Sequence, residues 1–333
     1  MKALIDKLLI LAIASVTLMQ AAPVARAQFT SQLEEKTIPV GDFTGIEVAD
    51  DFEVTLSSGP CVARVTVDKM LSPYVQVYVR GKVLHIDYDS KSVPKDVRKL
   101  YKGRNAPKPV FRANVSLQEL SSLTLAGNAT LTCGDVIDCH LTTDIDLQDR
   151  AQLKNLTLKT NALDLDMKKQ AQAAVSIDAL NKADVKTDGN SSLKATINAH
   201  DVVCTAAGSS EQAITATGEN ATFSGSGSAQ SSYTFTGEKA VVILGGSADM
   251  VLSGKGDALS VRGEKTSTLE AAAFDCKEAD VNLNGAVKAN ITVSDSLDAT
   301  LTGGSTLYYT GTPAFKIAKI VKSTLAPYGS TSK

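Results

Sequence analysis

The amino-acid sequence predicts an all-β protein, a parallel β-helix in which about ten coils of roughly 20 residues stack along one axis. Two observations carry this prediction. A motif recurs about every 20 residues from Leu120 onward, and apolar and polar residues alternate within each repeat. A repeat of this length is typical of a solenoid, in which each coil buries its apolar face only against its neighbours.

Residues 1–27 have the pattern of a secretory signal peptide. Lys2 and Lys7 make a basic start, residues 8–16 form an apolar run, and Ala25-Arg26-Ala27 is a cleavage site with small residues around a variable one. The apolar run is too short to span a bilayer as a helix, and no later segment is long and apolar enough. We therefore expect an exported chain without a transmembrane helix, located in the periplasm, on the cell surface or outside the cell.

Residues 28–118 are rich in β patterns but do not follow the repeat. Short alternating segments are separated by turn residues such as Gly59 and Gly81. They form either irregular first coils or a small sheet that caps the open end of the solenoid, since an uncovered strand edge invites pairing with other chains. Within this region, the basic stretch from Ser92 to Pro109 contains three prolines and indicates a long excursion or a linker.

The regular coils occupy residues 119–312. In each coil we name the residue at which the chain is expected to turn the corner residue; these residues are Gly127, Asp149, Lys169, Gly189, Gly208, Gly227, Gly246, Lys265, Gly285 and Gly303. Four positions before it all ten residues are apolar, and two positions before it seven of ten are. The interleaved positions hold only three apolar residues among twenty, so each coil should contain a strand with one buried face.

A column of small residues follows the corner. Two positions after the corner residue, nine of the ten residues are alanine or serine, namely Ala129, Ala151, Ala171, Ser191, Ser210, Ala229, Ala248, Ser267 and Ser305, with Val287 as the exception. We expect these side chains to point into a narrow lumen beside a tight turn, where glycine supplies the unusual backbone angles. Residues 313–333 should form the C-terminal cap or tail.

Charge and cysteine content restrict the partners and the cross-links. The formal net charge is -2, and it becomes -4 without residues 1–27, which argues against nucleic acid as a partner. Coils stack about 4.8 Å apart, while a disulfide needs Cα atoms within about 7 Å. Cys204 and Cys276 lie in distant coils and should be unpaired, which leaves Cys133 with Cys139, or Cys61 with one of these two.

The order of the motifs resembles that of a known family. Phe43-x-x-Ile46-x-Val48 opens the pattern, a strand with Gly81-x-x-Leu84-x-Ile86 follows, then come the coils, and the stretch from Ser296 to Pro313 closes it. Together these features resemble the head GIN domain family of bacterial envelope proteins, described as auto-transporter adhesins. The resemblance implies a right-handed parallel β-helix with an exported, surface-related role, and it supplies no catalytic residues. The sequence shows no translocator barrel.

Two groups of outward residues are candidate binding sites. Asp144, Asp164 and Asp184 recur in three successive coils, and Asp146 and Asp166 recur beside them. Carboxylates stacked at this spacing repel each other unless a cation or protonation intervenes, so they could hold Ca²⁺. Alternatively, they form a solvated face neutralised by nearby lysines, namely Lys154, Lys168, Lys169 and Lys186.

Apolar and aromatic side chains supply further candidates. Val203, Val241 and Ile243 are predicted to point outward, either as a contact surface for a partner or a second copy or as a patch shielded by an N-terminal loop. Four aromatic residues gather near the C-terminal end, where they either stack on sugar rings or close the core: Tyr308, Tyr309, Phe315 and Tyr328. The three histidines, His85, His140 and His200, are scattered and fit no catalytic motif.

These features favour a non-catalytic envelope β-helix, an adhesin that binds a glycan or another surface component. One alternative is a polysaccharide lyase or hydrolase, whose acid and base groups would have to come from residues such as Asp164 or Asp166 beside a cationic side chain. Another is a structural scaffold that self-associates through Val241 and Ile243. Fold alone does not decide between these hypotheses.

Overall fold

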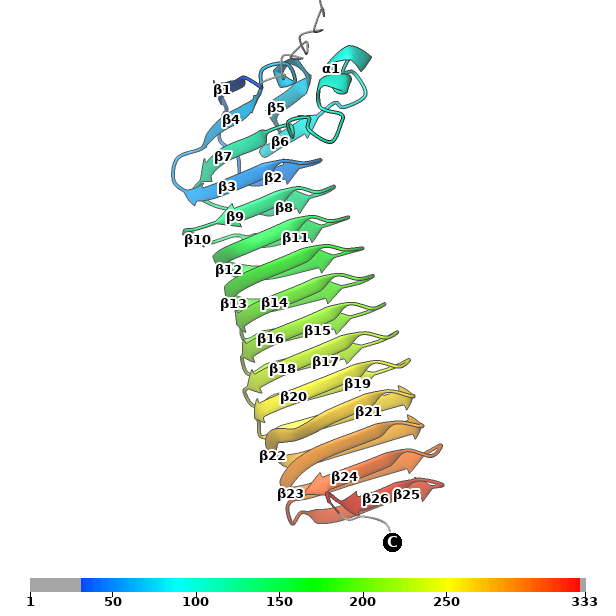
Figure 1. Ribbon diagram of the computed structural model, residues 1–333. Helices are drawn as coiled ribbons and strands as arrows, with labels where there is room; N and C mark the ends of the chain where they lie inside the picture. Colours follow the sequence, from blue (N-terminus) through cyan, green and yellow to red (C-terminus); the bar gives the residue numbers. More distant parts are fainter. Residues whose placement is uncertain (1–30, 330–333) are drawn as a thin grey trace, which may run out of the picture.

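The computed structural model describes residues 31–329, so the predicted signal peptide lies outside the described residues. The coils stack along one axis, with the N-terminal strands and helix α1 (Lys95–Leu100) at one end and the C-terminal strands at the other (Figure 1). Each coil contributes strand to two sides of the solenoid. Side 1 contains the strands that precede a corner residue, and side 2 contains those that follow it.

Side 1 is a parallel sheet. From the N-terminal end its strands are β6 (Val83–Tyr88), β2 (Gly45–Val48), β8 (Ser122–Leu125), β11 (Thr142–Leu147), residues 162–167 of β12 (Gln152–Met167), residues 182–187 of β13 (Gln172–Thr187), β15 (Asp201–Ala206), β17 (Asn220–Gly225), β19 (Lys239–Leu244), β21 (Ala258–Lys265), residues 278–284 of β22 (Thr268–Gly285), residues 296–302 of β23 (Lys288–Thr302) and β25 (Ala314–Val321).

Side 2 is also parallel. In the same order it contains β7 (Phe111–Leu117), β3 (Glu53–Ser58), β9 (Thr130–Cys133) with β10 (Val136–Asp138), residues 152–160 of β12, residues 172–178 of β13, β14 (Ser192–Asn198), β16 (Glu211–Thr217), β18 (Gln230–Thr236), β20 (Asp249–Lys255), residues 268–275 of β22, residues 288–293 of β23, β24 (Thr306–Thr310) and β26 (Thr324–Pro327). The predicted parallel β-helix is therefore confirmed.

The corner residues have the backbone that the repeat predicts. All ten have φ between 61° and 110°, including the non-glycine residues Asp149, Lys169 and Lys265, and two further corners of the same kind occur at Asp50 and Lys322. Successive corners lie on top of one another. This close stacking, together with the left-handed φ, explains why glycine occupies most of these positions.

The lumen contains one continuous apolar core. All ten residues of the predicted column of small side chains are at most 1% exposed. Aromatic rings fill part of the lumen: Phe223 stacks on Tyr233 with ring centroids 4.2 Å apart, and Phe235 meets Phe223 edge-on at 5.9 Å. Alternation along the strands thus produces a packed interior rather than a channel.

The N-terminal region supplies both coils and a cap. β2 pairs with β6 and β8, and β3 pairs with β7 and β9, so the coil formed by β2 and β3 lies between layers that come later in the chain. Three antiparallel strands then cover the end, namely β1 (Leu33–Ile38), β4 (Val62–Asp68) and β5 (Val75–Arg80), with the 3₁₀ helix η1 (Ser72–Tyr74) beside them. The excursion from Ser92 to Pro109 contains α1.

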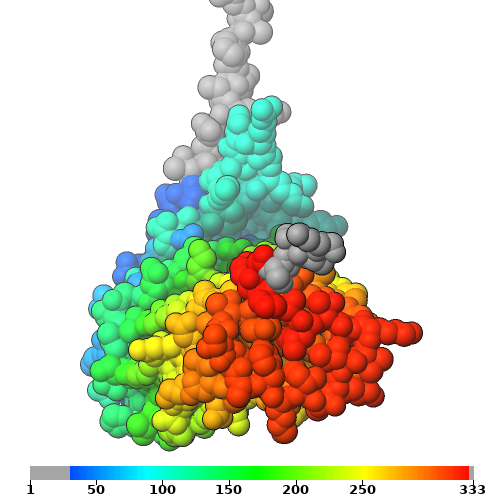
Figure 2. All heavy atoms as spheres, turned by 90° about the horizontal axis from the view of Figure 1, so that it is seen from below, coloured from blue at the N-terminus to red at the C-terminus, as the bar shows by residue number. Residues whose placement is uncertain are grey.

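The C-terminal strands continue the stack. β25 pairs with β23, β26 pairs with β24, and Lys322 turns the chain between them. Figure 2 looks along the stack from this end, with the last strands nearest the viewer and the N-terminal region behind. Every residue of β25 is exposed, including Phe315 and Ile317, because no further coil lies on it among the described residues.

All five cysteines are free, which agrees with the predicted lack of pairing for Cys204 and Cys276. Cys133 and Cys139, which could have paired, are separate buried thiols. Burial raises the pKa of the Cys204 thiol and raises that of Cys276 to about 12. These thiols therefore stay protonated and behave as small core residues.

Candidate functional site

The outward residues of side 1 form two rows along the solenoid. Outer row 1 runs through Asp144, Asp164, Asp184, Val203, Thr222, Val241, Ser260, Asp280, Asp298 and Lys316, which are register partners from coil to coil. Outer row 2 runs through Asp146, Asp166, Lys186, Thr205, Ser224, Ile243, Arg262, Asn282, Thr300 and Lys319. The five predicted aspartates thus lie together at the N-terminal end of both rows.

Lysines neutralise most of this acidic cluster. The ion pairs are Lys168 with Asp166 at 2.6 Å, Lys182 with Asp184 at 2.9 Å, and Lys186 with Asp164 at 3.4 Å and Asp184 at 3.3 Å. The hydrogen bond to Asp166 raises the pKa of Lys168. Burial lowers the pKa of Lys186, but the charges of Asp184 and Asp164 outweigh it, so the net pKa is raised.

Two of the expected lysines lie elsewhere. Lys169 pairs with Asp149 at the corner, at 2.5 Å, and Lys154 lies on side 2. Lys182 replaces them, because it occupies the outward position two residues before Asp184. Closeness along the chain is therefore a poor guide to which lysine pairs with which aspartate, because adjacent residues in a strand face opposite sides of the sheet.

The acidic cluster does not have the arrangement of a metal site. Within residues 31–329, no three His, Cys, Asp or Glu side chains are grouped so that they could hold a metal ion. Ca²⁺ needs six to eight oxygen ligands around one point, whereas these carboxylates form rows and three of them are held by lysines. The geometry favours a face neutralised by lysine over a calcium site.

The predicted apolar residues lie near the middle of the two outer rows. Ile243 is 41% exposed, and Val203 and Val241 are partly exposed. The N-terminal strands and α1 lie at one end of the stack, several coils away from β19, and Ile243 is exposed, so the alternative of shielding by an N-terminal loop is wrong (Figure 1). The excursion after β6 packs at its own end of the solenoid and does not reach along side 1.

The two candidate tyrosines have different surroundings. Tyr309 packs edge-on against Phe315, with ring centroids 5.1 Å apart, and so helps to close the C-terminal end of the core. Tyr308 is half-buried and lies beside Asn290 on the outer surface of side 2. Of these two tyrosines, Tyr308 is therefore the one on the outer surface of the solenoid's side.

A shallow trough runs along side 2, and sequence reasoning missed it. Two hollows of about 470 and 480 Å³ share Lys194 and Ala213 and so form one depression, which we name the trough. Its floor is the row Ala174, Lys194, Ala213 and Ser232, in register from coil to coil. Its walls include hydroxyl, amide and carboxylate groups, among them Ser176, Thr196, Glu211, Gln230 and Asp249.

Four polar side chains that line the trough have no partner in the described part of the chain. Among residues 31–329, the side chains of Lys194, Glu211, Gln230 and Asp249 have neither an ion pair nor a hydrogen bond, in contrast to the paired aspartates of side 1. The floor row continues through Val251, Glu270 and Asn290 to Tyr308, so this tyrosine lies in line with the trough. Small residues recurring at one outward position are the sequence signal that could have revealed it.

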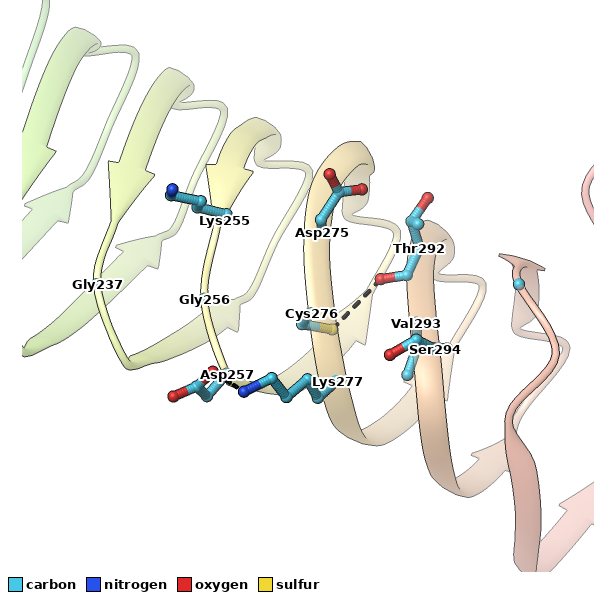
Figure 3. Close-up of a pocket in the computed structure, with 11 residues that line it drawn as sticks. Gly237, Lys255, Gly256, Asp257, Asp275, Cys276, Lys277, Thr292, Val293 and Ser294 are labelled. Carbon is cyan, nitrogen blue, oxygen red and sulfur yellow. Dashed lines mark hydrogen bonds and ion pairs between the residues drawn. The ribbon is translucent and has the colours of Figure 1, made fainter.

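Another hollow, of about 560 Å³, lies at the edge where side 2 turns into side 1 (Figure 3). Beside it the pairing of β22 with β23 shifts register, between Ala271 and Asp275 and between Cys276 and Glu278. An ion pair of 2.8 Å joins Asp257 to Lys277 on its rim. The Cys276 thiol donates a hydrogen bond to the Thr292 carbonyl, and its high pKa makes it a poor nucleophile.

The histidines do not form a catalytic arrangement. His85 lies 3.2 Å from Glu47 and stacks on Tyr78, while His200 lies between Asp201 and Glu219. In the part of the chain that the structure describes, no histidine hydrogen-bonds to a serine or cysteine side chain. The same part contains no helix long and apolar enough to cross a membrane.

Comparison with known proteins identifies the family. A family model described as "Putative auto-transporter adhesin, head GIN domain" matches residues 42–234 and 214–313. Comparison with curated proteins finds no match.

Comparison with solved structures finds crystal structures that match over most of the chain, among them three of Parabacteroides proteins. A putative adhesin from Parabacteroides merdae has 16% identity and a TM-score of 0.38, covering 89% of this chain and 96% of its own. A putative adhesin from Parabacteroides distasonis has 17% identity and a TM-score of 0.38, with 89% and 97% covered. A putative lipid binding protein from the same species has 16% identity and a TM-score of 0.30, with 89% and 96% covered. Because the family model spans most of the sequence, this chain belongs to the head GIN domain family.

Proposed function

We propose that this protein is an exported, non-catalytic adhesin that binds an extended glycan in the trough on side 2. The observation that carries the proposal is the set of unpaired hydrogen-bonding side chains that line the trough, whose floor consists of small residues apart from Lys194. A saccharide chain offers hydroxyl groups at regular intervals, and the solenoid offers partners at regular intervals of about 4.8 Å. The family description, which names an adhesin, supports this direction.

The chemistry of the trough favours a neutral or weakly charged sugar. Lys194 is the cation on the floor, and Glu211 and Asp249 are carboxylates on the wall, so neither sign of charge dominates. Hydroxyl and amide groups supply donors and acceptors without a net charge. Tyr308, in line with the trough, supplies an aromatic face on which a sugar ring can stack.

The test is a glycan array probed with residues 28–333 and two matched variants. Ser232→Trp fills the exposed floor of the trough, whereas Ser228→Trp places the same side chain at an exposed corner of the same coil. We expect glycan binding that Ser232→Trp reduces at least tenfold and Ser228→Trp leaves unchanged. Binding that survives Ser232→Trp would place the site elsewhere, and no binding to any glycan would refute the proposal.

A depolymerisation assay on anionic polysaccharides separates adhesin from enzyme. An acid and base pair for such a reaction would have to come from groups such as Asp166 and Lys168, which already form an ion pair on side 1. We expect no release of unsaturated or reducing ends. Chain cleavage that Asp166→Asn abolishes would overturn the non-catalytic function.

A further inference from the structure

We propose that the N-terminal end of this protein docks on a membrane surface rich in anionic phospholipid, through the excursion at residues 92–109. This inference goes beyond the proposed function and does not depend on the trough. It rests on a segregation of charge along the molecule. The excursion contains six lysine and arginine residues and one aspartate, which gives a net charge of +5. Because residues 28–333 carry -4 in total, the remainder of that chain carries -9.

An apolar face holds the excursion against the core. Val93 is 1% exposed, and Val97 and Tyr101 are partly buried against the same core cluster. Val97 and Tyr101 are four positions apart around α1, so they share one face of this short helix. The cations lie away from the core and are all exposed, namely Lys95, Arg98, Lys99, Lys102, Arg104 and Lys108. The excursion therefore presents its charge to the outside from a fixed position.

Most of these cations have no acidic partner. Over the range that the structure describes, only Lys99 among the six forms an ion pair, with Asp96 at 3.5 Å. The neighbouring carboxylate of Asp89 accepts hydrogen bonds from the backbone N–H groups of Lys91 and Ser92, and so holds the turn that begins the excursion. Exposed cations without partners produce a positive potential at this end, in contrast to the lysines of side 1, which are paired with aspartates.

Two exposed apolar side chains lie at the same end. Leu33 on β1 is 52% exposed, and Met70, in the turn after β4, is 45% exposed. Both are close to the end of the excursion, because Asp68 is the register partner of Leu33 and exchanges hydrogen bonds with Val110. Cations beside apolar side chains suit a bilayer surface, where the cations meet phosphate groups and the apolar groups enter the interface.

The arrangement favours a membrane over a soluble polyanion. The cations cluster on one short segment that projects from the N-terminal end of the stack, so they can meet a surface together (Figure 1). A sulfated polysaccharide would satisfy the charges but leave Leu33 and Met70 in water. An anionic surface repels the acidic solenoid, so the molecule approaches with its N-terminal end first. The trough, several coils away, then stays accessible.

Sedimentation with lipid vesicles tests the proposal. Residues 28–333 should bind vesicles that contain about 30% phosphatidylglycerol in phosphatidylcholine, and should not bind vesicles of phosphatidylcholine alone. Raising the salt concentration from about 0.1 M to about 0.5 M should weaken the binding, because it shortens the Debye length.

Two triple variants with the same net charge locate the contact. The first reverses three exposed charges of the excursion and consists of Lys102→Glu, Arg104→Glu and Lys108→Glu. It should weaken vesicle binding by at least about tenfold. The second reverses three exposed charges of the solenoid and consists of Lys239→Glu, Lys255→Glu and Lys288→Glu. It should change vesicle binding by less than about twofold, because salt screens charges that lie far from the surface.

Leu33→Ser with Met70→Ser tests the apolar contribution. This double variant should weaken vesicle binding about fivefold, because it removes the side chains that enter the interface. It should leave any binding of soluble dextran sulfate unchanged. Thermal unfolding of every variant shows whether lost binding reflects a lost fold.

Each contrary result overturns the proposal. Absence of binding to the phosphatidylglycerol vesicles would refute it, as would an equal loss in the two triple variants. Vesicle binding that the Leu33 and Met70 variant leaves unchanged would refute contact with the bilayer interface. Binding of dextran sulfate without binding of vesicles would assign the excursion to an anionic polysaccharide instead.

Discussion

At the scale of single residues, the corner position dominates. All twelve corner residues, counting Asp50 and Lys322, have positive φ values, between 52° and 110°. In this region the absence of a Cβ relieves both a backbone strain and a contact. A Cβ on Gly227 would lie 2.7 Å from the carbonyl oxygen of Gly208, below any real contact distance. Non-glycine corners survive only at some cost in backbone energy.

Opposite substitutions at two corners test this reasoning. Gly227→Ala should lower the midpoint of thermal unfolding, because alanine adds a steric clash to an unfavourable φ, at a cost of about 2 kcal/mol or more. Lys265→Gly should raise the midpoint slightly, by up to about 1 kcal/mol in stability, because φ of 65° strains a side chain. Circular dichroism melting curves measure both. Equal shifts in the same direction would contradict the steric account.

At the scale of elements, the N-terminal region, residues 31–118, is the least regular part of the fold. It contains three carboxyl groups, Asp50, Asp68 and Asp87, whose pKa values burial raises above the ordinary value of 3.8. Asp68 is fully buried and accepts a hydrogen bond of 2.9 Å from the backbone N–H of Val110, which joins the end of β4 to the start of β7. Burial therefore opposes ionisation of the Asp68 carboxyl group. Its oxygen still accepts the hydrogen bond that connects the two strands.

The sign of the resulting pH dependence follows from linkage. A carboxyl group with a raised pKa binds its proton more tightly in the folded chain, so it favours folding as the pH falls through the folded pKa toward 3.8, and it disfavours folding above. Asp68→Asn keeps an oxygen for Val110 and removes the charge. We expect its melting temperature to change less than that of the wild type between about pH 4 and pH 7.

Asp96→Asn, at a fully exposed position in α1, is the matched control for this prediction. It should leave the pH profile of the melting temperature as it is. A profile that Asp68→Asn steepens, or one that both variants flatten equally, would show that burial of Asp68 is not the cause.

The sequence predicted the coils closely and the ends and binding surfaces only in part. The positions of the coils follow from the alternation of apolar and polar residues and from the corner residue, both of which recur in every repeat. The interleaving of β2 and β3 between later layers depends on long-range pairing that no local pattern records. The trough was missed because outward alanine and serine residues resemble an ordinary solvated face until register places Ala174, Ala213 and Ser232 near one line.

At the scale of the whole molecule, stability should be local along the stack. Each coil contacts only its neighbours, so a weakened coil affects adjacent coils first. Phe223→Ala removes a fully buried ring that packs on Tyr233 and Phe235, at a cost of about 3–5 kcal/mol. Hydrogen exchange should then lose protection most in β15 to β19, with the loss decreasing toward both ends.

Phe52→Ala supplies the matched case at the other end of the stack. Phe52 is 1% exposed and its ring lies 5.3 Å from that of Phe111, so its loss should reduce protection in β3 and β7. The strands from β20 to β24 should keep theirs, because many intact coils separate them from the cavity. If either variant lowered protection equally from β1 to β26, the chain would unfold as one cooperative unit. The nearest-neighbour account of this solenoid would then be wrong, since a single defect could be felt at both ends only if the coils lacked independent stability.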